Sequence, residues 1–334
     1  MMTTSYTDMP LEKLLTEHPH IKDFFSAMGL HDLPHSPTLT GSLDAIDEEL
    51  MLDVGIERQE LLGRFAAYMD GVERLRNPNL TTIDSITVIG GRNKSGELEE
   101  FSLELRPGEV TCIVGPTGSG KSRFLADIEW LAQKDSPTGR QVLINGSVPD
   151  PTRRYAVEQK LVAQLSQNMN FVMDLSAEDF IRMHAESRMV PNIKEVCTTI
   201  LNLANSLAGE QFTPETPVTA LSGGQSRALM IADVACLSSS PIVLIDEIEN
   251  AGIDRKRALS LLSGRNKIIL MATHDPILAL MGQRRLVFKN GGVACVRTTS
   301  AAEVANLAMF EEMDARLTSV RHALRSGEEI SGEF

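Results

Sequence analysis

Residues 115–122 constrain the fold of this 334-residue chain more than any other stretch. They read Gly-Pro-Thr-Gly-Ser-Gly-Lys-Ser, which satisfies the pattern G-x-x-x-x-G-K followed by Ser or Thr. An apolar run, 110–114, precedes the segment and a helical run, 123–131, follows it, which is the context that the pattern requires. Glycines let such a loop turn tightly, so that its N–H groups and the following helix face one anion. The sequence therefore predicts a phosphate-binding loop.

Two side chains of this loop, which we call the cradle, carry specific chemistry. Lys121 is expected to reach the β and γ phosphates of a nucleoside triphosphate, and the Ser122 hydroxyl to bind Mg²⁺. The alternative, a glycine-rich turn that matches by chance, is disfavoured by the strand before it and the helix after it. The candidate nucleotide-binding residues of the cradle are Gly115, Pro116, Thr117, Gly118, Ser119, Gly120, Lys121 and Ser122.

An acidic pair follows about 125 residues further along the chain, at the end of the apolar run 241–245. A buried strand that ends in an acid would place Asp246 beside the cradle, where it can hold the Mg²⁺ shell. Glu247 comes next and is suited to orient or deprotonate an attacking water. Either acid alone could be a solvated strand end, but the pair together with the cradle favours a catalytic site.

Between these two segments stands Leu221-Ser222-Gly223-Gly224-Gln225, ahead of a helical run at 226–237. This segment resembles the signature motif of the ATP-binding cassette (ABC) ATPases. Further matches follow the order of that family: Gln167 resembles its Q-loop glutamine, Asp254 its D-loop aspartate and His274 its switch histidine. The resemblance covers about residues 82–297. The signature residues are Ser222, Gly223, Gly224 and Gln225.

The resemblance implies an α/β fold of the ABC type of P-loop NTPase. Such a fold has a mostly parallel sheet, an antiparallel β subdomain and a helical subdomain, here about 165–235. It also implies an ATP hydrolase that uses ATP and Mg²⁺ and works as a head-to-tail homodimer, in which the signature helix of one subunit contacts the γ-phosphate held by the other. The family assigns catalysis to Glu247, His274 and Gln167, ATP contacts to the cradle, the signature residues and Asp254, and Mg²⁺ to Ser122, Gln167 and Asp246.

Two stretches depart from the family pattern. The family stacks adenine on an aromatic residue in the region that here is 89–94, and no aromatic residue stands there. Arg92 could stack on the base instead, as a planar cation, which leaves base selectivity open. After Glu247 the chain runs Ile248-Glu249-Asn250, which resembles soluble members such as the ATPase of iron–sulfur assembly scaffolds.

Three segments are expected: a helical N-terminal domain at 1–76, the ATPase domain at 80–300, and a C-terminal helix and tail at 301–334. The first holds 14 acids against 6 bases, so −8 of the net charge of −13 lies there. It resembles a small helical domain that also occurs in iron–sulfur repair proteins, on 9–15, 18–19 and 28–30. Its histidines, among them His18, are expected to be solvated or capping, with a metal site as the alternative. Its second helical stretch has the core candidates Leu50, Leu52, Leu61, Leu62 and Phe65.

The periodicity of the ATPase domain predicts short strands joined by turns. The expected strands are 83–89, 101–105, 110–114, 242–245, 267–271 and a hairpin of 285–288 with 293–297. In the C-terminal helix, six apolar residues are expected near one stripe. They are Val304, Leu307, Phe310, Leu317, Val320 and Leu324.

Composition excludes some functions and leaves two interpretations open. The charge of −13 argues against direct nucleic-acid binding. With no apolar run of 18 residues, no secretory segment and no paired cysteines, we expect a cytoplasmic protein, or one held at a membrane through a partner. The N-terminal domain and Ile248-Glu249 favour a soluble ATPase that remodels or loads a client protein. The alternative is the ATP-binding subunit of an ABC transporter whose membrane subunits are separate chains. The sequence identifies neither client nor substrate.

Overall fold

The structure is a computed structural model. It describes residues 6, 9–18, 20–34, 36–76, 83–154, 160–166, 171–247, 253–264 and 266–330. The chain divides into two compact units, Met1–Leu80 and Thr81–Phe334. The linker expected at 76–79 lies outside the described residues except for Arg76, where the last helix of the first unit ends.

The first unit is helical. Its helices are α2 (Leu11–Glu17), α3 (Ile21–Ala27), α4 (Leu39–Asp44), α5 (Glu48–Val54) and α6 (Arg58–Arg76). Leu61 and Phe65 are buried as expected, but Leu50 and Leu52 are exposed, the latter by 80%. The prediction of these two as core residues is wrong, because α5 buries Met51 instead. Adjacent residues of a helix point about 100° apart, so the neighbours of Met51 on either side do not share its buried direction.

One histidine of this unit is not solvated, whereas His31 is exposed as expected. His18 is buried, and its ring lies edge-on to Tyr6 at 5.5 Å and to His20 at 5.6 Å between centroids. The side chain of His18 is therefore not solvated, but the residue is the C-cap of α2, the other position expected for these histidines. Within the described part of the chain, which omits His35, no group of three or more His, Cys, Asp or Glu side chains could hold a metal ion.

The second unit is built on a six-stranded sheet in the order β5-β6-β7-β3-β8-β9. The first five strands are parallel, and β8 and β9 form the expected antiparallel hairpin. A separate antiparallel sheet has the order β2-β1-β4. The strands are β1 (Ile86–Ile89), β2 (Ser102–Leu105), β3 (Val110–Val114), β4 (Gln141–Ile144), β5 (Val162–Leu165), β6 (Ile242–Asp246), β7 (Ile268–Ala272), β8 (Arg284–Lys289) and β9 (Gly292–Thr298).

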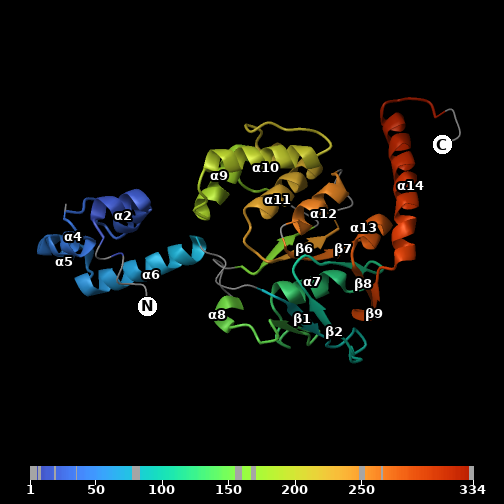
Figure 1. The fold of residues 1–334 in the computed structure, drawn as a ribbon, viewed down its shortest axis with the longest axis horizontal. Coiled ribbons are helices and arrows are strands. Elements are labelled where there is room, and N and C mark those ends of the chain that lie inside the picture. Colours follow the sequence, from blue (N-terminus) through green and yellow to red (C-terminus); the bar gives the residue numbers. More distant parts are fainter. Residues whose placement is uncertain are drawn as a thin grey trace. The chain divides into compact units, whose positions relative to one another are not determined.

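Helix α7 (Lys121–Glu129) packs between the two sheets (Figure 1). Alternate residues of each central strand point to opposite faces, so in β6 Ile242 and Leu244 pack toward α7 while Val243 and Ile245 pack the other way. The second face is covered by α11 (Gly223–Cys236), α12 (Arg255–Ser263) and α13 (Pro276–Met281). Strands buried on both faces explain the continuous apolar runs of the sequence.

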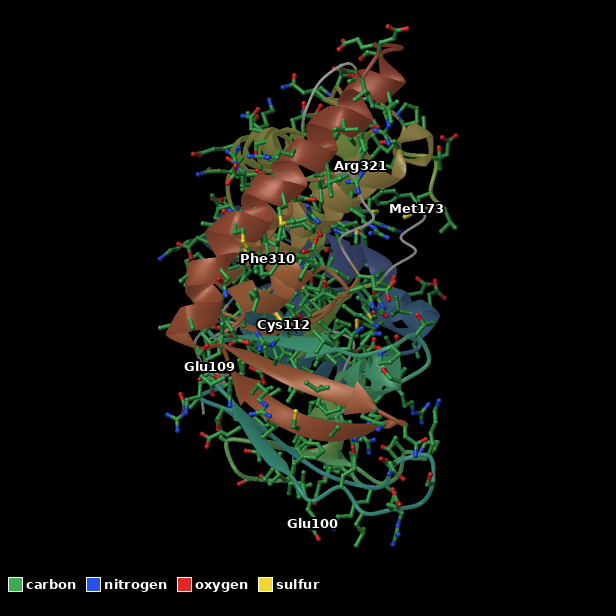
Figure 2. All side chains as sticks on the ribbon, turned by 90° about the vertical axis from the view of Figure 1, so that its right-hand side faces the viewer. Glu100, Glu109, Cys112, Met173, Phe310 and Arg321 are labelled. Atoms are coloured by element: carbon green, nitrogen blue, oxygen red, sulfur yellow. The ribbon has the colours of Figure 1, made fainter. Side chains whose placement is uncertain are left out.

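Helices α9 (Ala177–Ser187) and α10 (Ile193–Leu207) form a further helical layer with α11, around a core of their own. Two shorter elements are α8 (Pro151–Arg154) and the 3-10 helix η2 (Val218–Ala220). The long α14 (Ala301–Arg325) lies beside α13 (Figure 1). Phe310, labelled in Figure 2, is half-buried along it. Its expected stripe is only partly covered, since Val304, Leu317 and Leu324 are exposed. In the part of the chain that is described, no helix is long and apolar enough to cross a membrane.

Candidate nucleotide-binding site

The cradle joins β3 to α7 at the carboxyl end of the central parallel strands. Gly120 is the N-cap of α7 and has a φ of 105°, in the region that favours glycine. A Cβ atom at this position would lie 2.8 Å from the Cα atom of Gly291, in the turn between β8 and β9. Gly120 therefore serves twice, since it turns the backbone and, having no Cβ, lets the neighbouring turn approach the loop.

Lys121 lies inside the cradle rather than in solvent, with a relative exposure of 6%. Its Nζ atom donates to the carbonyl oxygens of Gly115 at 2.8 Å and Pro116 at 3.3 Å, and lies 3.1 Å from Nε2 of His274. The structure thus brings the cradle lysine and the candidate switch histidine into direct contact. A cation held by its own loop carbonyls is placed where a phosphate oxygen can replace them.

Ser122 and Asp246 meet across the site. The Ser122 hydroxyl donates to a carboxylate oxygen of Asp246 at 3.1 Å. Burial raises the pKa of Asp246 above its usual 3.8, and the charge of Glu247 acts in the same direction, against the hydrogen bond from Ser122. A hydroxyl and a partly desolvated carboxylate side by side are oxygen ligands of the kind that Mg²⁺ prefers. The residues present therefore fit this ion.

Glu247 has a φ of 51°, uncommon for a residue other than glycine. Three contacts hold it there. Its N–H donates to the carbonyl of Ala272 at 3.0 Å, its Oε1 lies 3.0 Å from Nε2 of His274, and its own carbonyl accepts from Arg227 at 3.0 Å. Arg227 was not predicted from the sequence. Its position on the signature helix, two residues after Gln225, is the signal that could have identified it.

The signature residues cap their own helix. Ser222 is the N-cap of α11 and forms a reciprocal capping box with Gln225, while Gly223 and Gly224 open the first turn. The Gln225 amide also donates to the backbone carbonyl of Glu210 at 3.3 Å. Among the described residues, no hydrogen bond joins this segment to the cradle. The structure therefore does not bring these two parts of the predicted site together by hydrogen bonds within one chain.

The remaining candidates from the sequence are Asp254, Gln167 and Arg92. Asp254 is the N-cap of α12, where its side chain accepts from the backbone N–H of Arg257. Gln167 lies outside the described residues. Arg92 is exposed, and its guanidinium donates to the Gly96 carbonyl of its own loop at 2.9 Å.

The geometry defines the class of protein. A cradle with its lysine, a serine–carboxylate pair for a metal and a glutamate beside a histidine are the parts of a nucleoside triphosphatase. The model of the ABC transporter family matches residues 98–250. The chain is 48% identical to an uncharacterized ABC transporter ATP-binding protein of Methanocaldococcus jannaschii, over 75% of this chain and 96% of that one. The chain therefore belongs to the ABC family and is an ABC-type ATPase.

Two other comparisons agree. The lipoprotein-releasing system ATP-binding protein LolD of Psychrobacter arcticus is 27% identical over 58% of this chain and 88% of its own length. A solved structure of the ATP-binding subunit of an ABC transporter superposes with a TM-score of 0.51 and 20% identity, over 70% of this chain and 99% of that one. At that identity the superposition supports the fold alone, and it confirms the predicted ABC-type architecture.

Proposed function

We propose that the chain binds Mg-ATP in the cradle and hydrolyses it between two copies of itself, as the ATP-binding subunit of a transporter whose membrane subunits are separate chains. The contact of Lys121 and Glu247 with His274 is the observation that supports hydrolysis most directly. It gathers a phosphate-binding cation, a base and a histidine at one edge of the sheet.

Each residue has a distinct task in this proposal. Lys121 exchanges its bonds to loop carbonyls for bonds to the β and γ phosphates. Ser122 and Asp246 hold Mg²⁺, which supplies neutralisation of the phosphate charge when it is bound. Glu247 orients and deprotonates the attacking water, and His274 senses the γ-phosphate from its place between Lys121 and Glu247. Gln167 is proposed as a further Mg²⁺ ligand.

The position of the signature segment supports a homodimer. Ser222 and the N–H groups of Gly223 and Gly224 begin α11 and form an anion-binding helix start. A twofold axis would present this start to the γ-phosphate in the partner's cradle, so that two copies enclose two ATP molecules head to tail. Hydrolysis would then remove the bridging group and loosen the interface, which converts the reaction into movement.

The partner that we propose is a membrane subunit of a transporter. The relatives are named as ATP-binding proteins of transport systems, which favours the transporter interpretation over the soluble remodelling ATPase that the sequence favoured. Residues 172–173, ahead of α9, offer a contact surface, since Val172 is 93% exposed and Met173 follows it, also exposed. Phe180, by contrast, is buried in the core of the helical layer and so is unavailable to a partner.

Capture of the partner by the ATP-locked protein tests this. Glu247→Gln should retain ATP and hold its partner, and crosslinking with mass spectrometry on membrane and soluble fractions identifies it. We expect an integral membrane protein, recovered with and without residues 1–76 and lost on Val172→Glu. Capture of a cytosolic protein that requires residues 1–76 and ignores Val172→Glu would contradict the transporter interpretation and favour remodelling.

A further inference from the structure

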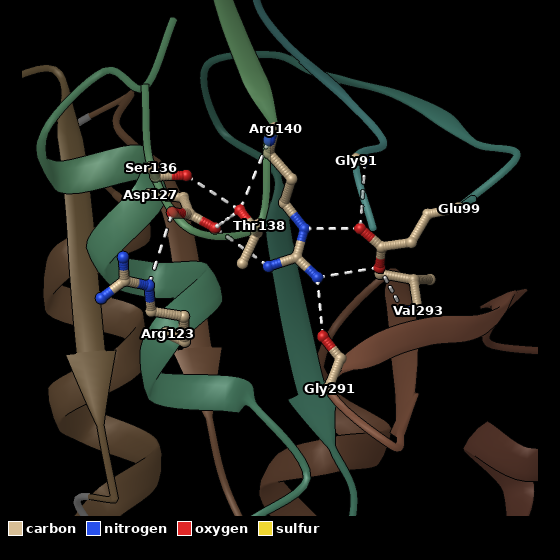
Figure 3. A network of polar contacts seen from close by, with 9 residues as sticks. All are labelled: Gly91, Glu99, Arg123, Asp127, Ser136, Thr138, Arg140, Gly291 and Val293. Atoms are coloured by element: carbon tan, nitrogen blue, oxygen red, sulfur yellow. Dashed lines mark hydrogen bonds and ion pairs between the residues drawn. The ribbon is translucent and has the colours of Figure 1, made fainter. Parts of the chain in front are cut away.

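Arg140 is the largest side chain in the described structure to be fully buried, with an exposure of 0%. Its guanidinium makes a bidentate pair with Glu99, with both N···O distances at 2.8 Å, and a third bond to Asp127 of α7 at 3.0 Å (Figure 3). The rings of Phe124 and Phe288 lie 5.2 and 5.7 Å from its central carbon. One buried cation thus satisfies two buried carboxylates, an arrangement that requires good geometry to persist.

The fourth bond of Arg140 leads to the cradle. Its Nη2 donates to the carbonyl oxygen of Gly291 at 2.9 Å, and the N–H of the same residue donates to the carbonyl of Ser119 at 2.8 Å. Gly291 also presses on Gly120, where an added Cβ would meet its Cα atom. The turn 290–292 is therefore fixed on one side by Arg140 and on the other by the cradle backbone.

Glu99 extends the network to the loop 90–98, which includes most of the region 89–94 where the family places its base-stacking residue. Its carboxylate accepts from the backbone N–H groups of Gly91 at 3.2 Å and Val293 at 2.7 Å. Lys94 of the same loop donates from Nζ to the Gly118 carbonyl of the cradle at 2.7 Å, and from its backbone N–H to the carbonyl of Asn290 at 2.9 Å. The loop, the turn and the cradle are joined in one ring of hydrogen bonds.

We propose that Arg140 is a positioning residue for nucleotide binding, which holds the loop 90–98 and the turn 290–292 in register against the cradle. The inference rests on the proposed function, that the cradle binds ATP. None of the bonds of Arg140 reaches Glu247 or His274. Its loss should weaken binding equally in the ground and transition states, and so raise KM with little change in kcat.

The test uses the full chain and separates positioning from simple stability. Arg140→Met keeps the apolar stem and removes all four bonds, and Arg284→Met serves as the matched control. Arg284 also ties β8 to other segments, through the Glu109 carboxylate beside β3 and the Glu104 carbonyl of β2, but at the strand end away from the turn. We expect Arg140→Met to raise KM for ATP about tenfold or more, as supporting residues do at other sites, with kcat within about threefold. The control should leave KM unchanged.

A triple variant, Glu99→Met with Asp127→Leu and Arg140→Met, completes the test. Replacing a whole buried ionic cluster with apolar residues often preserves stability, so the melting temperature should recover. KM should remain high, because Gly291, Gly91 and Val293 still lack their partners.

If KM recovers together with the melting temperature, or never rises, the proposal is overturned. If Arg140→Met does not fold, the triple variant and Glu99→Gln decide by the same measurements. If the unmodified protein does not hydrolyse ATP at all, the proposed function itself is overturned, whatever the variants show.

Discussion

The cradle and the signature segment are both loops that begin helices, yet their polar groups are used differently. At the cradle, side chains from distant parts of the chain meet: Lys121 with His274, and Ser122 with Asp246. At the signature segment, Ser222 and Gln225 bond to each other and to nearby backbone. The cradle is assembled by the fold of one chain, whereas we propose that the signature segment binds an anion held by a second copy. This contrast is the basis for placing the reaction between two copies.

The largest effect is expected at the cradle. Lys121→Ala removes the cation that faces the phosphates, and charge-assisted hydrogen bonds are the strong class. We expect the loss of measurable ATP binding in an equilibrium titration with fluorescently labelled ATP. Lys134→Ala, a lysine outside the cradle, is the control. Unchanged affinity in Lys121→Ala would remove the cradle from the proposed site.

A smaller effect is expected on the choice between adenine and guanine nucleotides. The region 89–94 lacks an aromatic ring, and Arg92 donates to its own loop, so contacts with the base should be loose. We expect GTP to compete with ATP within about tenfold, a difference of about 1.4 kcal/mol. Competition binding measures it, with Arg92→Ala as the comparison. A strong preference for ATP that Arg92→Ala leaves intact would mean that another residue recognises adenine.

The smallest effect concerns the pH dependence of stability. Burial alone would raise the pKa of Glu99, but the hydrogen bonds from Arg140, Val293 and Gly91 outweigh it and hold this pKa below its usual 4.5. A carboxylate with a lowered folded-state pKa stabilises the protein above the unfolded-state pKa, and this contribution is lost as the pH falls through the folded value. Glu99→Gln removes it, so its unfolding free energy should fall less steeply below pH 4.5 than that of the unmodified protein. Urea denaturation across this acid range measures the slopes, and parallel curves would contradict the account.

The features predicted well from the sequence are those set by local pattern. The cradle, the capped helix at Ser222 and the hairpin around Asn290 depend on residues that are close in sequence. The strand β4 was missed because the stretch before it is rich in turn residues, which hides where the strand begins. The exposure of Leu52 was missed because periodicity does not tell which side of a short helix faces the core.

The Arg140 network shows the same limit more sharply. Its partner Glu99 is 41 residues away, and a lone arginine before a short strand has the pattern of a surface residue. Only the fold brings two carboxylates and the turn 290–292 around it. Arg227 lies on the signature helix, where the sequence could have pointed to it, but its bond to the Glu247 carbonyl at the end of β6 is shown only by the fold. The part of the site that could not be predicted from the sequence consists of contacts between distant segments, which no motif describes.

The most direct measurement of the central claim is the oligomeric state of the hydrolysis-deficient protein. Glu247→Gln should slow hydrolysis by about 10²–10⁴, the usual contribution of a general base, and so retain bound ATP. We predict a dimer by size-exclusion chromatography in Mg-ATP and a monomer without nucleotide. Adding Ser222→Arg should leave ATP binding intact but abolish the dimer, because the cradle is complete in one chain and the signature segment acts on the other. A Glu247→Gln monomer at saturating ATP, or a dimer that Ser222→Arg does not disturb, would contradict the account.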